Sequence, residues 1–406
     1  MQPSARFFRT TTSTLHQYRG ISDSRPFVAG DRVILRTTSS RQPHQVLSKP
    51  LAPRKEIQTH KGVIRHEDVI GRRVRDVVKS SVKTGKGGTE YRLHEVRLEE
   101  YVRLTRRLVT PLYPQDAQLI VNLLDLHPDF SDSSTMDDEA KLEILEAGTG
   151  HGALTLYLSR AIHAANSPRP GPSNGDDAAG KIESNEKALA DWENQRRAII
   201  HTIEISPTNS AHAQEIVEGF RHGQYYHNVD FHTGNVGDWV TTKLAAGNEK
   251  PFLAHAFLDL PGSEKQLEVV SKALRVDGTL VVFNPSITQI SDCLVEAKRL
   301  RLELELEKVI ELGVNGGTGG REWDIRVVRP RALKKASALD GEEDAVIGTD
   351  MFMDEALEES AQVTDLKVVA AEQAWKMVCR PKVGGGYGEL TVGGGFVGVF
   401  RKLRKA

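Results

Sequence analysis

Three glycines, each separated from the next by one residue, stand in the segment EAGTGHG at 146–152. The apolar stretch LEIL precedes them and ALTLYLSRAI follows, so we expect a strand, a tight turn and then an amphipathic helix. Glycine lets the backbone turn sharply and lets a ligand approach without a Cβ in the way. The start of the helix adds free backbone N–H groups. Such a turn is typical of a site that binds a nucleotide cofactor.

Polar side chains stand at the ends of the three strands predicted after this turn. Glu204 ends the second strand, where a carboxylate can accept hydrogen bonds from both ribose hydroxyls; the alternative is a solvent-facing side chain. Asn235 follows the third strand, and its side-chain carbonyl can accept from an adenine amino group or simply form the turn. Asp259 ends the fourth strand, where open parallel sheets bind ligands. Its alternative role is to cap the next helix.

The glycine turn alone does not separate two classes of enzyme, because nicotinamide-dependent dehydrogenases also use one. The third glycine of the dinucleotide fingerprint is missing at its usual offset, and an acid, Glu146, stands before the first glycine. Both features favour an S-adenosylmethionine-dependent methyltransferase. A dehydrogenase would also need a catalytic His or Tyr in the second half of the chain, and no such residue stands out.

The elements that must position these residues begin near Lys141. Strand-like and helix-like stretches alternate from there, which predicts a mostly parallel sheet with helices on both faces. Two final strands, near 322–328 and 394–401, have no clear helix between them, so we expect a terminal antiparallel pair. Two inserts, 165–198 and 336–365, should loop out largely disordered. The first begins rich in Pro, Gly and Asp, and the second holds ten acids and no Lys or Arg.

A separate region precedes the alternating pattern. Residues 27–97 contain short β-rich pieces, which predicts a small β-rich domain. Helices are expected at 98–109, stopped by two prolines, and at 116–126, with Asp116 as the N-cap. The domain that holds the glycine turn would then span residues 98–406.

The formal net charge of -1 hides an asymmetry. Residues 1–125 carry 23 Lys+Arg against 12 Asp+Glu, and the remainder carries 31 against 43. This fits either a basic presequence with solvated surface or a cationic module that meets polyanions. Residues 1–26 are basic, rich in Ser and Thr, and hold one acid, as mitochondrial presequences do; a disordered basic tail is the alternative.

Two classes of protein do not fit the composition. No apolar run reaches about 18 residues, so no membrane span is expected. The two cysteines, Cys293 and Cys379, are too few for a disulfide framework, which favours a reducing compartment. No CxxC pair exists, and we expect no metal site.

Six stretches of the chain together resemble the tRNA adenine-N1 methyltransferases, which modify position 58 in the TΨC loop. They are THKGVIRHEDVIG (59–71), LEEYVRLTRRLVTPLYPQDAQLIVNLLDL (98–126), LEAGTGHGALTLYLSRAI (145–162), FLDLP (257–261), LVVFNPSITQI (280–290) and REWDIR (321–326). The resemblance implies an α/β, Rossmann-like fold of the class I S-adenosylmethionine methyltransferases. Its mostly parallel sheet ends in an antiparallel strand, and a small β-rich N-terminal domain precedes it. The REW form and that separate domain look more like the bacterial and mitochondrial branch than the cytosolic catalytic subunit.

The same resemblance implies S-adenosyl-L-methionine as cofactor and tRNA as partner. The cofactor site would then comprise Leu112, Gly148, Thr149, Gly150, His151, Gly152, Ala153, Glu204, Asn209, Asn235 and Asp259. Three of these depart from the family pattern. His151 stands where a small residue is usual, Asn235 where Asp is usual, and Asn209 where Arg is frequent.

The chemistry that the resemblance implies is methyl transfer to a nitrogen that already carries a lone pair, so alignment matters more than a strong base. Asp259 would orient the exocyclic amino group of adenine and stabilise the cationic product. Tyr113 is expected to stack on the base once it leaves its helix, or else to anchor the helix junction. Arg321 and Trp323 are candidates to line the same pocket. Phosphates of tRNA would meet Arg72, Arg73, Arg75, Lys79, Lys83, Lys86, Arg103, Arg106 and Arg107.

Several expectations remain open at this point. The protein is predicted to act in the mitochondrial matrix, or alternatively in the nucleus. The family implies a homo-oligomer, a tetramer, or a complex with a non-catalytic partner subunit. Alternative functions are a catalytically inactive tRNA-binding paralogue, an NAD-dependent dehydrogenase, and a methyltransferase that acts on a small molecule or a protein.

Overall fold

The computed structural model describes eight stretches of the 406-residue chain. They are residues 25–38, 43–82, 88–128, 141–170, 187–313, 323–328, 376–381 and 394–404. The chain divides into two compact units, one of residues 1–312 with 393–406 and one of residues 313–392. Residues 1–24 of the predicted presequence and the whole predicted acidic insert at 336–365 lie outside the described residues.

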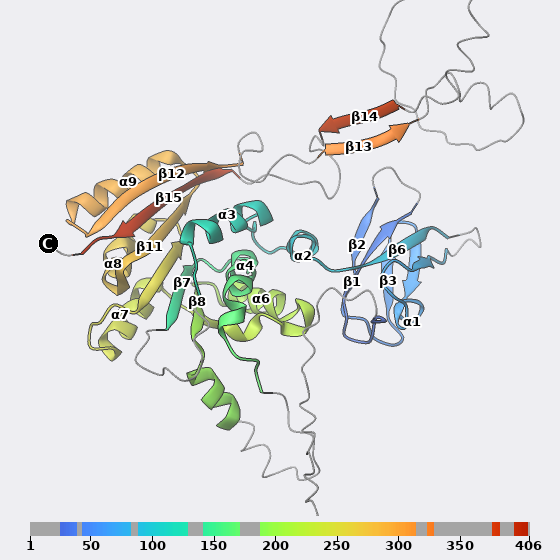
Figure 1. Cartoon of the computed structure of the whole chain (residues 1–406), viewed down its shortest axis with the longest axis horizontal. Coiled ribbons are helices and arrows are strands. Elements are labelled where there is room, and N and C mark those ends of the chain that lie inside the picture. Colours follow the sequence, from blue (N-terminus) through green and yellow to red (C-terminus); the bar gives the residue numbers. More distant parts are fainter. Residues whose placement is uncertain are drawn as a thin grey trace, which may run out of the picture. The chain divides into compact units, whose positions relative to one another are not determined.

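A four-stranded antiparallel sheet forms near the start of the described chain (Figure 1). Its order is β2-β1-β6-β5, and the strands are β1 Val33–Thr37, β2 Gln45–Leu47, β5 Val77–Lys79 and β6 Glu90–Glu95. The hairpin of β3 Glu56–Thr59 and β4 Gly62–Arg65 and the one-turn helix α1 His66–Val69 lie between β2 and β5 in sequence. Alternate residues Val33 and Leu35 of β1 pack with Tyr91 and Leu93 in one core, because successive side chains of a strand point to opposite faces. The predicted β-rich N-terminal sheet is confirmed.

Two helices follow, α2 Leu98–Leu104 and α3 Pro114–Leu124, and both differ from the predicted bounds. α2 ends five residues before the predicted end at 109, because Thr105 already has an extended backbone with a ψ of 155°. α3 begins at Pro114, whose missing N–H is no loss in a first helical turn. Tyr113 is its N-cap residue, so the predicted N-cap, Asp116, was wrong; that side chain is buried in the first turn.

A seven-stranded sheet dominates the first unit, in the order β12-β15-β11-β10-β7-β8-β9 (Figure 1). Its strands are β7 Leu142–Ala147, β8 Ala198–Glu204, β9 Val229–Thr233, β10 Leu253–Leu258, β11 Leu274–Asn284, β12 Leu304–Leu312 and β15 Gly395–Lys402. The helices between them are α4 Ala153–Ile162, α6 Pro207–Glu218, α7 Val236–Ala246, α8 Leu267–Ala273 and α9 Ile287–Arg299. Short 3-10 turns are η1 His163–Ala165, η2 Arg221–Gly223, η3 Tyr226–Asn228 and η4 Ser263–Gln266.

Helices cover both faces of this sheet, as predicted. Ile144 of β7 belongs to a core that it shares with α3, α4 and α6. The next residue, Leu145, belongs to a second core with α7, α8 and α9. Adjacent strand residues point to opposite faces, so the central strands must be apolar on both sides.

The end of the sheet differs from the expectation. β15 lies between β11 and β12 and is antiparallel to both, which confirms a terminal antiparallel strand. The prediction that this strand pairs with the stretch near 322–328 was wrong. That stretch forms β13 Trp323–Val328 and pairs with β14 Lys376–Pro381, a strand we had not predicted, in a two-stranded sheet of the second unit.

The predicted insert at 165–198 is shorter than expected. Residues 187–194 are helical, and Trp192 is buried there with its indole N–H donated to the Ser167 carbonyl at 2.9 Å. The Asn166 side chain accepts from the backbone N–H groups of Arg197 and Ala198. Burial of a large ring and these bonds hold both ends of the insert, and only 171–186 lies outside the described residues. Among the described residues, no helix is long and apolar enough to cross a membrane.

Charged side chains join β1 and its flanks to the seven-stranded part. The buried Asp31 carboxylate lies 2.7 Å from His222 Nε2, and Arg32 Nε donates to the Gly219 carbonyl at the end of α6 at 3.1 Å. Arg36 forms an ion pair with Glu100 of α2. These contacts fix the basic N-terminal sheet against α2 and α6.

Replacing Phe400 of β15 tests how much the fold depends on this inserted strand. Its ring is fully buried between the sheet and α9, so Phe400→Ala should lower the free energy of unfolding by about 3–5 kcal/mol through lost burial and the cavity left behind. Urea unfolding measures the change. Leu403→Ala, at an exposed position just after the strand, should change it by no more than about 0.5 kcal/mol.

Candidate functional site

The glycine turn connects β7 to α4, where the sequence predicted it. Gly148, Gly150 and Gly152 have φ angles of 91°, 54° and 79°. Residues that carry a Cβ rarely adopt this region of backbone conformation. A Cβ on Gly148 would lie 2.2 Å from the Asp259 carbonyl oxygen. The turn therefore packs backbone against backbone on the end of β10, and only glycine fits there.

Two predicted acidic residues contact the glycine turn, Glu204 through its carboxylate and Asp259 through its backbone. Glu204, at the end of β8, accepts from the Gly150 N–H at 3.0 Å and from the Ser206 N–H at 3.1 Å. Asp259, just after β10, donates its own backbone N–H to the Ala147 carbonyl at 2.9 Å. The strands β10, β7 and β8 are neighbours, so their carboxyl ends bring both acids to one edge of the sheet.

Burial sets the charge of this edge. It raises the pKa of Asp259 to about 6, with the nearby Glu204 charge as the second cause. Glu146 is fully buried, which raises its pKa to about 7; the Thr155 hydroxyl donates to it at 2.6 Å and works in the opposite direction. Three carboxyl groups thus share a poorly solvated space, and a cationic ligand would relieve their repulsion.

His151 lies inside the turn rather than in solvent, with 2% of its surface exposed. Its Nε2 is 3.2 Å from the Thr105 hydroxyl, and its ring meets His212 edge to face at 6.0 Å. Burial lowers the pKa of His151 to about 4, helped by the charges of His212 and Arg107, so the imidazole is neutral at pH 7. The bulk of this residue is thus accommodated between the turn, α6 and the segment after α2.

The predicted residues before and after the glycine turn occupy different surroundings. Leu112 is half-buried and packs on the core that lies under α3 and α4. Tyr113 is half-buried, and the Arg107 guanidinium lies 5.7 Å from its ring centroid. Ala153 opens α4 and is buried. Asn209 lies in the first turn of α6, where its backbone N–H donates to the Ser206 hydroxyl at 3.3 Å.

Asn235 has a local role that the sequence left as an alternative. It is the N-cap residue of α7, and its side-chain oxygen accepts from the Gly237 and Asp238 N–H groups at 2.7 and 3.4 Å. The oxygen we had expected to meet an adenine amino group is therefore engaged in capping, which supports the turn-forming role.

The sequence predicted Thr149 as a site residue but not its partner, Thr202. The Thr149 and Thr202 hydroxyls lie 2.6 Å apart and tie the turn to β8. Thr202 is two residues before Glu204, so alternation along the strand already placed both on one face and was the available signal. Of the two residues proposed to line the pocket, Arg321 lies outside the described residues and Trp323 belongs to β13 in the second unit.

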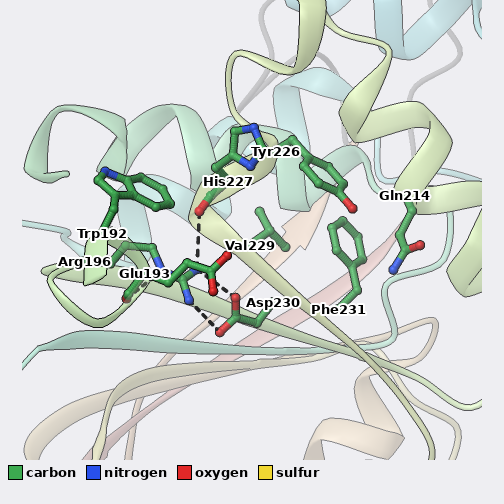
Figure 2. Close-up of a pocket in the computed structure, with 9 residues that line it drawn as sticks. All are labelled: Trp192, Glu193, Arg196, Gln214, Tyr226, His227, Val229, Asp230 and Phe231. Carbon is green, nitrogen blue, oxygen red and sulfur yellow. Dashed lines mark hydrogen bonds and ion pairs between the residues drawn. The ribbon is translucent and has the colours of Figure 1, made fainter. Parts of the chain in front are cut away.

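A pocket of about 320 Å³ lies elsewhere, at the amino end of β9 (Figure 2). Arg196 donates to both Asp230 oxygens, at 2.7 and 3.1 Å, and to the His227 carbonyl at 3.3 Å. The guanidinium also lies 5.9 Å from the Trp192 ring centroid. The charged groups at the floor of this pocket are paired with one another, so we assign it no ligand.

Known proteins resemble the chain in sequence and in fold. The model of the TrmI-like N-terminal family matches residues 26–74. A tRNA (adenine(58)-N(1))-methyltransferase TrmI of Thermus thermophilus is 31% identical over 274 residues, which cover 67% of this chain and 81% of that protein. The TrmI of a second strain of the same species matches equally well.

Two solved structures share the fold. A SAM-dependent O-methyltransferase from Thermotoga maritima has a TM-score of 0.53 at 14% identity, covering 96% of this chain and 99% of that one. The tRNA (m1A58) methyltransferase TrmI from Aquifex aeolicus has a TM-score of 0.50 at 18% identity, covering 94% and 100%. These likenesses confirm the class I methyltransferase fold.

The raised pKa of Asp259 predicts a pH-dependent cost in stability. The Asp259 carboxyl group has a pKa of about 6 in the folded protein and its ordinary value of 3.8 in the unfolded chain. Between these two pH values the folded protein binds more protons than the unfolded chain, so the wild-type free energy of unfolding falls as the pH rises. The Asp259 contribution to this fall should be on the order of 3 kcal/mol, and Asp259→Asn should remove it while leaving the contribution of Glu146, whose pKa is also raised.

Urea unfolding at about pH 4, 5 and 7.5 measures the difference between the two proteins. The variant should exceed the wild type most above pH 6 and match it near pH 4. Asp292→Asn, at an exposed position on α9, is the matched control; it keeps Asp259, so its pH curve should follow that of the wild type. Parallel pH curves for wild type and Asp259→Asn would contradict the assigned pKa.

Proposed function

The chain belongs to the family of tRNA (adenine(58)-N(1))-methyltransferases, and from that membership we propose that it methylates N1 of adenine 58 in tRNA with S-adenosylmethionine. The observation that carries the proposal is the edge formed by the glycine turn, Glu204 and Asp259. The dehydrogenase and inactive-paralogue alternatives found no support: the relatives are named as methyltransferases, and the intact glycine turn and acids argue against an inactive paralogue.

The donor set of this edge fits S-adenosylmethionine. A sulfonium and an ammonium group make the ligand cationic, and the site offers the buried carboxyl groups of Glu146 and Glu204 and the half-buried one of Asp259. The positive φ angles of Gly148, Gly150 and Gly152 form the tight turn between β7 and α4 on which a nucleoside would lie. When bound, the cofactor supplies an electrophilic methyl group. Glu204 would hold the ribose, while Leu112 and Asn209 remain proposed contacts.

Asp259 is the residue best placed to act on the substrate. With a pKa of about 6 its carboxyl group is ionised at pH 7.5. As a carboxylate it would accept from the exocyclic amino group of adenine and stabilise the positive charge that methylation creates. Adenine N1 needs no base, so orientation and charge are the main contributions of the protein. Tyr113, with Arg107 beside its ring, would stack on the base after it leaves its helix.

The basic face proposed to hold tRNA is largely exposed. Arg72, Arg73, Arg75 and Lys79 of the N-terminal sheet are exposed, as are Arg106 and Arg107 after α2. Arg103 is half-buried and donates to Gln45 at 2.6 Å, so its role is partly structural. Lys83 and Lys86 lie outside the described residues. Phosphate contacts from such a face would position tRNA without reading its sequence.

Two broader proposals rest on the sequence and on family membership. The basic, Ser- and Thr-rich residues 1–26 support import into the mitochondrial matrix, with the nucleus as the alternative. Fusing them to a fluorescent protein would show the destination. Membership of the family supports a homo-tetramer or a complex with a non-catalytic subunit, and light scattering of the purified chain would distinguish the two.

Asp259→Ala should abolish methylation while the protein stays folded. Losing the group that faces developing charge should lower turnover at least about a hundredfold. Mass spectrometry of nucleosides from an unmodified tRNA, incubated with labelled cofactor, measures the product and its position. Asp292→Ala is the control and should keep wild-type turnover. Near-normal turnover of Asp259→Ala would remove Asp259 from the mechanism.

Binding of tRNA should weaken steeply with salt. Each tRNA phosphate that the protein neutralises releases counterions. The logarithm of the affinity should therefore fall linearly with the logarithm of the salt concentration, with a slope of several units. The double variant Arg72→Gln/Arg73→Gln should reduce that slope by about 2. Lys272→Gln/Lys298→Gln removes the same charge from exposed positions of α8 and α9 and should leave it unchanged. Filter binding over a salt series measures the slope, and a flat response in the wild type would exclude this face.

A further inference from the structure

The segment Thr105–Val109, here called the strap, lies across the glycine turn. It starts where α2 ends and runs toward α3. The hydroxyl oxygen of its first residue, Thr105, lies 3.2 Å from His151 Nε2. At its other end, a Val109 methyl carbon lies 3.5 Å from where a Cβ of Gly150 would stand. The strap thus touches the turn at both ends.

The hydrogen bond between Thr105 and His151 has a definite direction. The Thr105 hydroxyl also lies 3.3 Å from the Val102 carbonyl, which can only accept. We assign the single proton of this hydroxyl to Val102 and the hydrogen of the neutral imidazole to His151 Nε2, which then donates to Thr105. The Nδ1 atom of His151 then carries no hydrogen, and it is buried without a hydrogen-bond partner among the described residues. A neutral ring suits this arrangement, since burial lowers the pKa of His151 to about 4.

A second imidazole holds the next residue of the strap. The Nε2 atom of His212, in α6, lies 2.9 Å from the Arg106 carbonyl oxygen. Because a carbonyl oxygen can only accept, Nε2 carries the hydrogen and donates it. The His212 and His151 rings meet edge to face at 6.0 Å. One imidazole comes from the glycine turn and the other from α6, and together they hold two consecutive residues.

Beyond these bonds, the strap is held through the exposed Arg107 guanidinium, which donates to the Arg103 carbonyl at 3.3 Å and lies 5.7 Å from the Tyr113 ring centroid. Arg106, Arg107 and Leu108 are exposed, Leu108 at 43%. In the part of the chain that the structure describes, the backbone N–H groups of residues 106–109 join no backbone hydrogen bond. Side-chain bonds from the turn and α6 are therefore the main restraint on its position.

We propose that His151 and His212 are positioning residues that hold the strap closed over the glycine turn and so set how fast the cofactor leaves. This inference rests on the proposed function, because it takes S-adenosylmethionine as the ligand of the turn. A cofactor seated against Gly150 would lie under Val109, so a loose strap would release it sooner.

The test is a double-mutant cycle on cofactor release. Stopped-flow displacement of S-adenosylmethionine gives the dissociation rate, and calorimetry gives Kd, for wild type, His151→Ala, Thr105→Val and the double variant. Each single change should raise the dissociation rate about tenfold, as expected for the loss of one hydrogen bond. The double variant should be no faster than the singles, because they share one bond. KM for the cofactor should rise in proportion to its Kd.

Two further variants separate a positioning role from simple loss of bulk. His151→Gln keeps an N–H near the place of Nε2 and should release the cofactor within about twofold of wild type. Thr241→Val is the matched control. Thr241 is exposed on α7, and its hydroxyl donates to the Gly237 carbonyl, so the change removes a threonine hydrogen bond that involves no imidazole. His212→Ala, at a half-buried position, repeats the test should His151→Ala not fold.

The outcomes bear on different claims. If wild type binds the cofactor but the His151, Thr105 and His212 variants release it at the wild-type rate, the strap inference is wrong and the proposed function stands. The same holds if His151→Gln behaves like His151→Ala. If wild type binds no S-adenosylmethionine at all, the proposed function itself fails.

Discussion

The backbone contact between Gly148 and Asp259 is the constraint on which the site depends. A side chain at 148 would collide with the carbonyl of 259, so the ends of β7 and β10 can approach only because the residue is glycine. That approach brings the Asp259 carboxyl group to the turn that would hold the cofactor. The positive φ angles of Gly150 and Gly152 continue the same path into α4.

Electrostatics at this edge follows from burial rather than from any single partner. Removing Asp259 and Glu146 from water raises the pKa of both; the charge of Glu204 raises that of Asp259 further, and the charge of Asp259 raises that of Glu146. The arrangement costs stability in the free protein, as expected where groups are held ready for a charged ligand. His151 is the opposite case, because burial keeps its ring neutral and spares the site a competing positive charge.

The N-terminal sheet supplies the complementary feature, an exposed basic surface joined firmly to the seven-stranded part. The joint uses buried or half-buried charges, with Asp31 facing His222 and Glu100 facing Arg36, whereas Arg72 and Arg73 stay in solvent. Charges used for the joint are thus not available to a polyanion, and those left exposed are. A long substrate could then be positioned by the basic surface while one base reaches the carboxylate edge.

Local pattern determined the glycine turn, the strand ends at Glu204 and Asp259, the alternating β and α elements and the β-rich start, because each depends on neighbours within a few residues. Tertiary structure decided what depends on distant partners. β15 paired between β11 and β12 rather than with the stretch near 322–328, since strand pairing is not encoded in either strand alone. The hydroxyl that meets His151 comes from 46 residues earlier, and the pKa of Asp259 exists only once the fold excludes water.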